Sequence, residues 1–170
     1  MKPGLPSFDR IVSSHGERIY RLCCAYAVNQ EDRRDLHQEI LLKVWKNLPS
    51  FNGSAALGTW IYRVAVNTSI DWLRRSRRDR RRMVARPVDD LEVPDATQDT
   101  ESRAVGREDL RRLLELISEL SFVDRTLISL YLEGLGYDEI AEVMGISAGN
   151  VGVRIHRVRT RLRNRYEGRK

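Results

Sequence analysis

The amino-acid sequence predicts an all-α protein of two small helical domains joined by a flexible acidic linker. Apolar residues recur at helical spacing in both halves of the 170-residue chain, and no stretch shows the two-residue alternation of a β-strand. Between the halves, the segment ARPVDDLEVPDATQDTESR contains two prolines and many acidic residues but few large apolar ones. The predicted domains are therefore residues 1–82 and 105–170, with the linker at residues 83–104.

Two helices are expected in the first fifty residues. Residues 8–28 place six apolar residues where they can share one helical face: Ile11, Val12, Ile19, Leu22, Cys23 and Tyr26. Residues 30–48 repeat the pattern with Leu36, Ile40, Leu41, Val44, Trp45 and Leu48. Tryptophan at helical spacing is usually a core residue, so we expect Trp45 to be buried. Pro49 should end the second helix.

A loop and a third helix follow. In the loop SFNGSAALGT, the Asn52-Gly53 pair favours a turn, and Ser54 and Thr59 are available as helix caps. The third helix should run from residue 60 to about residue 75, with Ile61, Ala65, Thr68 and Trp72 on its buried face. It ends in a run of seven arginines at positions 74, 75, 77, 78, 80, 81 and 82. Like charges one turn apart repel, so this run indicates either a phosphate-binding segment or a solvated tail.

Helical spacing returns in the second half. Leu110, Leu113, Leu114 and Ile117 predict one helix, and residues 123–132 predict another. The segment YDEIAEVMGISAGNVGVRIHRVRTRLR, residues 137–163, then has the outline of a helix-turn-helix DNA reader.

Each part of the predicted helix-turn-helix has a physical reason. The first helix gains an apolar face from Ile140, Ala141, Val143 and Met144, Gly145 can adopt the left-handed conformation of the turn, and Ser147 can cap the second helix. The buried stripe of the second helix should be Val151, Ile155, Val158 and Leu162. The residues turned away from it should be Asn150, Arg154, Arg157 and Arg161. A plain helical hairpin with a solvated basic face would give a similar pattern.

The charge of the chain indicates a polyanionic partner. It has 30 Lys and Arg against 24 Asp and Glu, a net charge of +6 and a sequence pI near 9.7. Aromatic side chains also occur beside amide and arginine side chains, a combination that can hold unstacked bases. That group comprises Phe51, Asn52, Trp60, Tyr62, Arg63 and Asn67. The alternative for Trp60 is a place in the hydrophobic core.

The sequence argues against an enzyme. His15, His37 and His156 show no metal-ligand spacing, and there is no glycine-rich phosphate loop or nucleophile elbow, so we expect no metal and no cofactor. The adjacent Cys23 and Cys24 should be reduced, because a disulfide between neighbours in one helix is strained. No segment resembles a signal peptide or a membrane span, which predicts no membrane insertion and a cytoplasmic location.

Three segments together resemble the extracytoplasmic-function group of the sigma-70 sigma factors. They are DLHQEILLKVW at residues 35–45, FNGSAALGTWIYRVAVNTSIDWLRRSRR at residues 51–78, and the block at residues 113–163. The resemblance implies a region-two domain and a region-four domain, which bind core RNA polymerase and promoter DNA without catalysis. It also implies an anti-sigma factor as a partner. The chain departs from the family at Leu120-Ser121, where members usually have Leu-Pro, and at Gly149 and Gly152 in the recognition helix.

The resemblance implies roles for particular residues. The residues that match the family's contacts with the polymerase clamp helices are Asp35, Gln38, Glu39, Leu42 and Trp45. Reading and capture of minus-ten bases fall to Asn52, Gly53, Ser54, Trp60, Arg63 and Asn67. Reading of the minus-thirty-five element falls to Ser147, Asn150, Arg154 and Arg157, and contact with the polymerase flap to Leu120, Phe122 and Leu127. The competing hypothesis is a stand-alone helix-turn-helix regulator whose first domain senses a ligand or dimerises.

Overall fold

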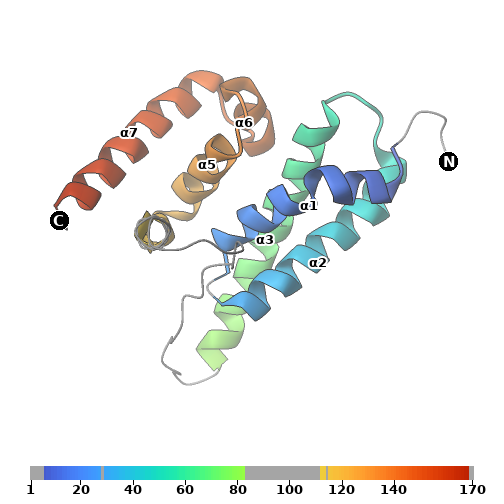
Figure 1. The fold of residues 1–170 in the computed structure, drawn as a ribbon, viewed down its shortest axis with the longest axis horizontal. Coiled ribbons are helices and arrows are strands. Elements are labelled where there is room, and N and C mark those ends of the chain that lie inside the picture. Colours follow the sequence, from blue (N-terminus) through green and yellow to red (C-terminus); the bar gives the residue numbers. More distant parts are fainter. Residues whose placement is uncertain (1–5, 28, 83–111, 114, 169–170) are drawn as a thin grey trace, which may run out of the picture.

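The computed structural model describes residues 6–27, 29–82, 112–113 and 115–168, and its side-chain description omits residues 77–82. Every regular element in these ranges is a helix, as the sequence predicts (Figure 1). The helices form two units, α1 to α3 and α5 to α7, that lie side by side. The predicted acidic linker at residues 83–104 lies outside the described residues.

The first unit contains α1 (Phe8–Cys24), α2 (Gln30–Asn47), the short 3-10 helix η1 (Leu48–Ser50) and α3 (Leu57–Arg82). Side-chain caps begin the first two helices: Ser7 Oγ accepts from the Arg10 amide at 3.4 Å and Asn29 Oδ1 from the Asp32 amide at 2.7 Å. Pro49 lies within η1, so the long α2 ends where the sequence predicts. The three helices enclose a core that includes Ile19, Leu36, Ile40, Val44, Ile61 and Ala65.

The structure corrects four expectations for this unit. The first helix ends at Cys24 rather than residue 28, and the third begins at Leu57, three residues earlier than predicted. Thr59 therefore lies inside α3 and is buried, so it is not a cap. Trp45 is not a core residue, because its side chain is 54% exposed. The buried face of α2 is centred on Leu36, Ile40 and Val44, and a residue next to Val44 is turned about 100° away from that face.

The second unit contains a helical segment at residues 112–113 and 115–118, then α5 (Phe122–Leu132), α6 (Tyr137–Met144) and α7 (Ala148–Glu167). Gly145, at φ 67°, makes the left-handed turn after α6, and Ser147 Oγ caps α7 by accepting from the Asn150 amide at 3.3 Å. Ile140, Ala141 and Val143 are buried, as is the predicted α7 stripe of Val151, Ile155, Val158 and Leu162. The helix-turn-helix predicted from the sequence is present.

The two units share a hydrophobic core. One cluster of buried residues joins Ile61 and Tyr62 of α3 with Leu130 of α5 and Ile140 of α6. A smaller cluster lies within the second unit and contains Leu116, Ile117, Leu120, Ile128, Val158 and Leu162. Helix α3 packs against α6, and α1 against α5 (Figure 1). The described residues thus form a closed arrangement in which the second unit lies against the first.

Candidate nucleic-acid and protein interfaces

The outer face of α2 presents a strip of exposed side chains. Asp35, Gln38, Leu42 and Trp45 recur at intervals of three and four residues, so they share one side of the helix, and all four are exposed. Leu42 and Trp45 are 48% and 54% exposed, which is unusual for such large apolar side chains. We call these four residues the α2 strip. An apolar pair bordered by polar groups is typical of a protein-binding surface.

Glu39 lies at the border of the α2 strip and is held by two cations. Its carboxylate is 3.7 Å from Lys43 Nζ, and it accepts a hydrogen bond of 2.6 Å from Arg75 Nη2 on α3. Lys43 also lies 3.6 Å from Asp71 of α3. These ion pairs tie the exposed side of α2 to α3, so Glu39 helps to hold the strip in place as well as lining it.

The loop before α3 contains a compact turn. The Ser54 amide donates to Asn52 Oδ1 at 3.0 Å. Gly53 adopts φ 77°, a backbone conformation that residues with a Cβ atom rarely take. All three residues are exposed. Beside the turn, the rings of Phe51 and Trp60 are tilted against each other with centroids 5.3 Å apart. Trp60 is partly buried and packs against the core, as the core alternative expects, and its role with bases stays a prediction.

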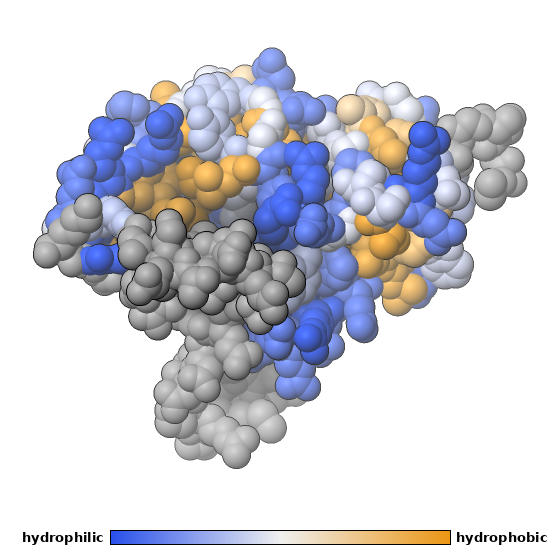
Figure 2. Space-filling model, in the orientation of Figure 1, coloured by the Kyte–Doolittle hydropathy of each residue, from blue (hydrophilic) through white to orange (hydrophobic). Residues whose placement is uncertain are grey.

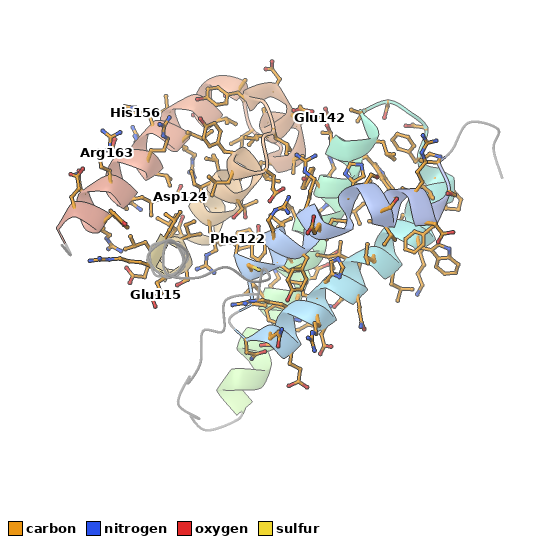
Figure 3. All side chains as sticks on the ribbon, in the orientation of Figure 1. Glu115, Phe122, Asp124, Glu142, His156 and Arg163 are labelled. Carbon is orange, nitrogen blue, oxygen red and sulfur yellow. The ribbon has the colours of Figure 1, made fainter. Side chains whose placement is uncertain are left out.

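Arg63 and Asn67 follow Trp60 on α3 but have different surroundings. Asn67 is exposed, whereas Arg63 reaches across to the second unit. Its Nη2 donates to the Glu142 carboxylate at 2.9 Å and to the Glu142 main-chain carbonyl at 3.1 Å. Glu142 lies where α6 meets α3 (Figure 3). The six candidate base-contacting residues therefore lie along the loop and the first turns of α3, but one of them is occupied by an internal ion pair.

The candidate recognition helix α7 has an exposed outer face. Asn150 and Arg157 are exposed, as predicted, whereas Arg154 is partly buried at the edge of the helix. Arg154 Nη1 lies 3.3 Å from Asp124 Oδ1, and Arg161 Nη1 lies 3.7 Å from the other oxygen of the same carboxylate. Asp124 is placed between α5 and α7 (Figure 3). Arg154 thus has a structural partner in addition to its candidate role with DNA.

Three outward-facing residues of α7 were not identified from the sequence as candidate contacts. Val153 is 51% exposed, and His156 and Thr160 are exposed on the same side of the helix. The signal that could have found them is the buried stripe, because the residues about half a turn from its centre must point outward. An exposed valine on a groove-facing helix can contact a thymine methyl group, so Val153 extends the candidate reading surface.

The comparisons with known proteins support both units. Residues 11–79 match the family model described as Sigma-70 region 2, and residues 110–162 match that described as Sigma-70, region 4. The ECF RNA polymerase sigma-E factor of Haemophilus influenzae is 31% identical over 167 residues, which cover 95% of this chain and 88% of the relative. The chain belongs to the ECF sigma factors of the sigma-70 family.

Other sigma factors show the same relationship. The ECF sigma factor SigW of Bacillus subtilis is 31% identical over 169 residues, covering 92% of this chain and 87% of the relative. SigE of Mycolicibacterium smegmatis is 33% identical over 164 residues, and this chain spans 62% of its length. Among solved structures, the sigma factor RpoE from Bartonella quintana, in complex with the anti-sigma factor NepR, has a TM-score of 0.77 at 20% identity. It matches 92% of this chain and 94% of that chain, which shows a common fold.

In this sigma factor, Cys23 is buried in the core and Cys24 is partly buried, and both are free thiols. Burial raises the pKa of Cys23 well above that of a free thiol, and it also raises the pKa of Cys24. Within the described ranges, no group of three or more His, Cys, Asp or Glu residues could hold a metal ion. No helix in those ranges is both long and apolar enough to span a membrane.

Proposed function

We propose that this sigma factor binds core RNA polymerase, directs it to specific promoters and assists in opening the duplex. The observation that carries the proposal is the exposed apolar pair Leu42 and Trp45 on α2, in the same chain as a helix-turn-helix. A stand-alone regulator that dimerises through its first domain could also use such a pair, but the match of both units to the sigma-70 family favours a polymerase-binding surface. A specificity subunit needs both a protein-binding surface and DNA-binding surfaces.

The α2 strip is the proposed contact with the clamp helices of the polymerase. Leu42 and Trp45 supply exposed apolar area, and a tryptophan that becomes buried on binding is the kind of residue that dominates binding energy at protein interfaces. Asp35, Gln38 and Glu39 surround the pair with carboxylate and amide groups that can fix the orientation of the partner. The flap contact falls to Phe122, Leu120 and Leu127, of which the last two are buried in the closed arrangement.

The loop with Asn52, Gly53 and Ser54, together with Trp60, Arg63 and Asn67, is the proposed minus-ten site. Flipping a base out of the duplex costs a few kcal/mol, and a preformed pocket offsets this cost only for the base that it fits. The ordered turn at Gly53 and the ring pair of Phe51 and Trp60 supply a preformed rim of this kind. Asn67 and Arg63 would then provide amide and cationic groups beside the captured strand.

The start of α7 is the proposed minus-thirty-five reader. Asn150 and Arg157 present amide and guanidinium groups that suit base edges and phosphates in the major groove. Ser147 holds the N-terminus of the helix through its cap, and Arg154 contributes from the edge of the same surface. Because the two DNA sites lie on different units, binding at one raises the effective concentration of the other at its own element.

This role needs no catalysis by the chain itself and places it in the bacterial cytoplasm with the polymerase. Among the solved structures that share the fold, CnrH is in complex with the cytosolic domain of CnrY, and the sigma factor RpoE is in complex with the anti-sigma factor NepR. We therefore include an anti-sigma factor among the partners of this chain. A pull-down from cells grown without the inducing stimulus should recover such an inhibitor, and its absence would count against this part of the proposal.

Transcription in vitro with purified core polymerase tests the main proposal. The chain should support transcripts from specific start sites, whereas a stand-alone regulator would instead bind a palindromic duplex tightly without polymerase. Arg154→Ala should weaken recognition of a few upstream base pairs, and Asn52→Ala should impair opening or downstream discrimination. If both changes reduced only nonspecific affinity, the assignment of the two DNA sites would be wrong.

A further inference from the structure

Several residues that the proposed function needs for DNA or polymerase are engaged between the two units. Figure 2 shows that hydrophilic residues cover the middle of the molecule on this face, where the units meet. The contacts between the units include specific ion pairs and hydrogen bonds. They indicate that the closed arrangement is a defined state rather than a loose association of two domains.

Glu133, at the end of α5, forms the most elaborate of these contacts. Its carboxylate accepts from Arg21 Nε at 2.7 Å, from Arg21 Nη2 at 2.9 Å and from Arg18 Nε at 3.3 Å. Arg18 also donates to the main-chain carbonyl of Glu133. The Glu133 side chain is only 8% exposed, so these charge-assisted bonds lie largely away from water. Two arginines of α1 are thereby clamped onto one carboxylate of the second unit.

Arg63 of α3 is also held by a carboxylate of the second unit. It is paired with Glu142 of α6, whose side chain is 43% exposed. A captured DNA strand would present phosphates to Arg63, and a carboxylate is the protein group that most resembles a phosphate to a guanidinium. Glu142 therefore binds the guanidinium group of Arg63, the cation that the proposed minus-ten site requires.

A third group of contacts covers the start of α5. The hydroxyl of Tyr26 donates to Thr126 Oγ1 at 2.7 Å in a buried hydrogen bond, and the ring of Phe122 lies 5.5 Å from that of Tyr26. Arg125 Nη1 donates to the main-chain carbonyl of Ala25 at 3.0 Å. Phe122 lies between α5 and α1 (Figure 3). The residue assigned to the polymerase flap thus faces the first unit instead.

We propose that the closed arrangement is an autoinhibited state of the free sigma factor and that Glu133 is its main latch. The inference rests on the proposed function, because it assigns inhibition to the masking of Arg63 and Phe122. Opening must precede simultaneous contact with both promoter elements, so the apparent affinity for promoter DNA is reduced by the fraction of molecules that are open. Breaking the latch raises that fraction and tightens binding.

The test compares Glu133→Gln with Glu17→Gln in the full-length chain. Glu17 lies 3.9 Å from Arg21, but it belongs to α1 itself and its side chain is 92% exposed. The control therefore removes one carboxylate beside the same arginine without touching the inter-unit contact. Donor and acceptor dyes on α2 and α7 report the distance between the units, and fluorescence anisotropy measures binding to a fork-junction DNA that carries both promoter elements.

Glu133→Gln should increase the distance between the dyes and lower the Kd for the fork-junction DNA by about tenfold, the factor that corresponds to about 1.4 kcal/mol. Glu17→Gln should leave both values unchanged. If Glu133→Gln changes neither value, or opens the chain without tightening DNA binding, autoinhibition by this latch is wrong. Thermal unfolding followed by circular dichroism confirms that the variant is folded.

A second variant keeps the proposal testable if Glu133→Gln does not fold. Glu142→Gln alters a more exposed pair and should tighten DNA binding by about threefold, a smaller effect than that of Glu133→Gln. No change in its DNA affinity would overturn the masking of Arg63. Failure of the wild-type chain to direct polymerase to any promoter would refute the proposed function, whereas failure of the latch leaves wild-type promoter-directed transcription intact. The two failures are therefore distinguishable.

Discussion

The α2 strip and the Arg63 end of α3 belong to the same three-helix unit, yet they differ in availability. Leu42 and Trp45 are exposed, whereas Arg63 is bonded to Glu142 of the second unit. The contact proposed for the polymerase clamp helices can therefore form on the closed arrangement as it stands, whereas the flap residues Leu120 and Leu127 are buried. The contact proposed for DNA requires an exchange of ionic partners. This difference suggests an order of events in which polymerase binds first and promoter contacts follow.

The contacts that hold the two units together differ in strength. A half-exposed pair such as Arg63 with Glu142 stabilises by only about 0–1 kcal/mol, so DNA phosphates can replace it readily. The buried hydrogen bond between Tyr26 and Thr126 and the shared core around Ile61 and Leu130 hold the units more firmly. Separation of the units therefore requires the loss of these buried contacts as well as of the ion pairs between the units.

The largest effect is expected from removing the apolar pair of the α2 strip. The double change Leu42→Ala and Trp45→Ala should weaken binding to core polymerase by at least about thirtyfold, since a buried aromatic anchor at an interface is often worth more than 2 kcal/mol. Surface plasmon resonance with immobilised core enzyme measures this loss. Leu132→Ala removes one exposed leucine on the second unit, a match for Leu42 of the pair, and should have a much smaller effect than Leu42→Ala alone. Equal losses would show that the α2 strip is not the docking surface.

A smaller effect is expected from the buried hydrogen bond between the units. Thr126→Val should lower the free energy of unfolding by about 1–3 kcal/mol, because the buried hydroxyl of Tyr26 loses its partner. Urea unfolding measures the change. In a double-mutant cycle, Tyr26→Phe combined with Thr126→Val should show a coupling energy of about 1 kcal/mol. Additive losses would mean that the two residues do not interact and that the closed arrangement is held elsewhere.

The arginines of α7 should differ in the kind of effect they produce. Arg157→Ala should weaken binding to a minus-thirty-five duplex and lower the slope of log affinity against log salt by about one, without loss of stability. Arg154→Ala should weaken DNA binding and also reduce stability by about 0.5 kcal/mol, because it breaks the pair with Asp124. Anisotropy titrations at several salt concentrations and parallel unfolding curves separate the two. Identical behaviour would contradict the structural role given to Arg154.

The smallest effect concerns pH. Burial, with help from the charge of Arg18, lowers the pKa of His15 below its usual value of 6.5. The folded state therefore favours neutral His15, and its contribution to stability is present above pH 6.5 and is lost as the pH falls through and below that value. The free energy of unfolding should decline between pH 7 and pH 5 by less in His15→Gln than in the wild type. If the free energy of unfolding falls equally with pH in the two proteins, His15 does not contribute to the decline.

Local signals explain what could be predicted from the sequence. The turn at Gly145, the cap at Ser147 and the buried stripe of α7 each depend on residues within a few positions of one another, and all three are confirmed. Helix boundaries were less well predicted. Helix α3 begins at Leu57 although Gly58 weakens helical propensity there, because packing of Leu57 and Thr59 against the first unit outweighs that preference.

The exposure of Trp45 shows the limit of reasoning from residue type. Its hydrophobicity predicted a core position, but the core of the first unit is completed by Leu36, Ile40 and Val44 of the same helix. The family resemblance pointed to Trp45 as a docking residue, which is compatible with its exposure. For the six minus-ten residues and the four minus-thirty-five residues, the roles in binding stay predictions, because the structure shows where they lie and not what they bind.

The sequence alone determined the all-helical fold, the helix-turn-helix and the family, because these depend on spacing and order along the chain. The tertiary structure decided how the two units meet and which charged groups are occupied. Arg63 and Glu142 are 79 residues apart, and Arg21 and Glu133 are 112 residues apart, so no local pattern could pair them. Such contacts exist only once the shared core has brought the units together, and they determine which surfaces are accessible before any partner binds.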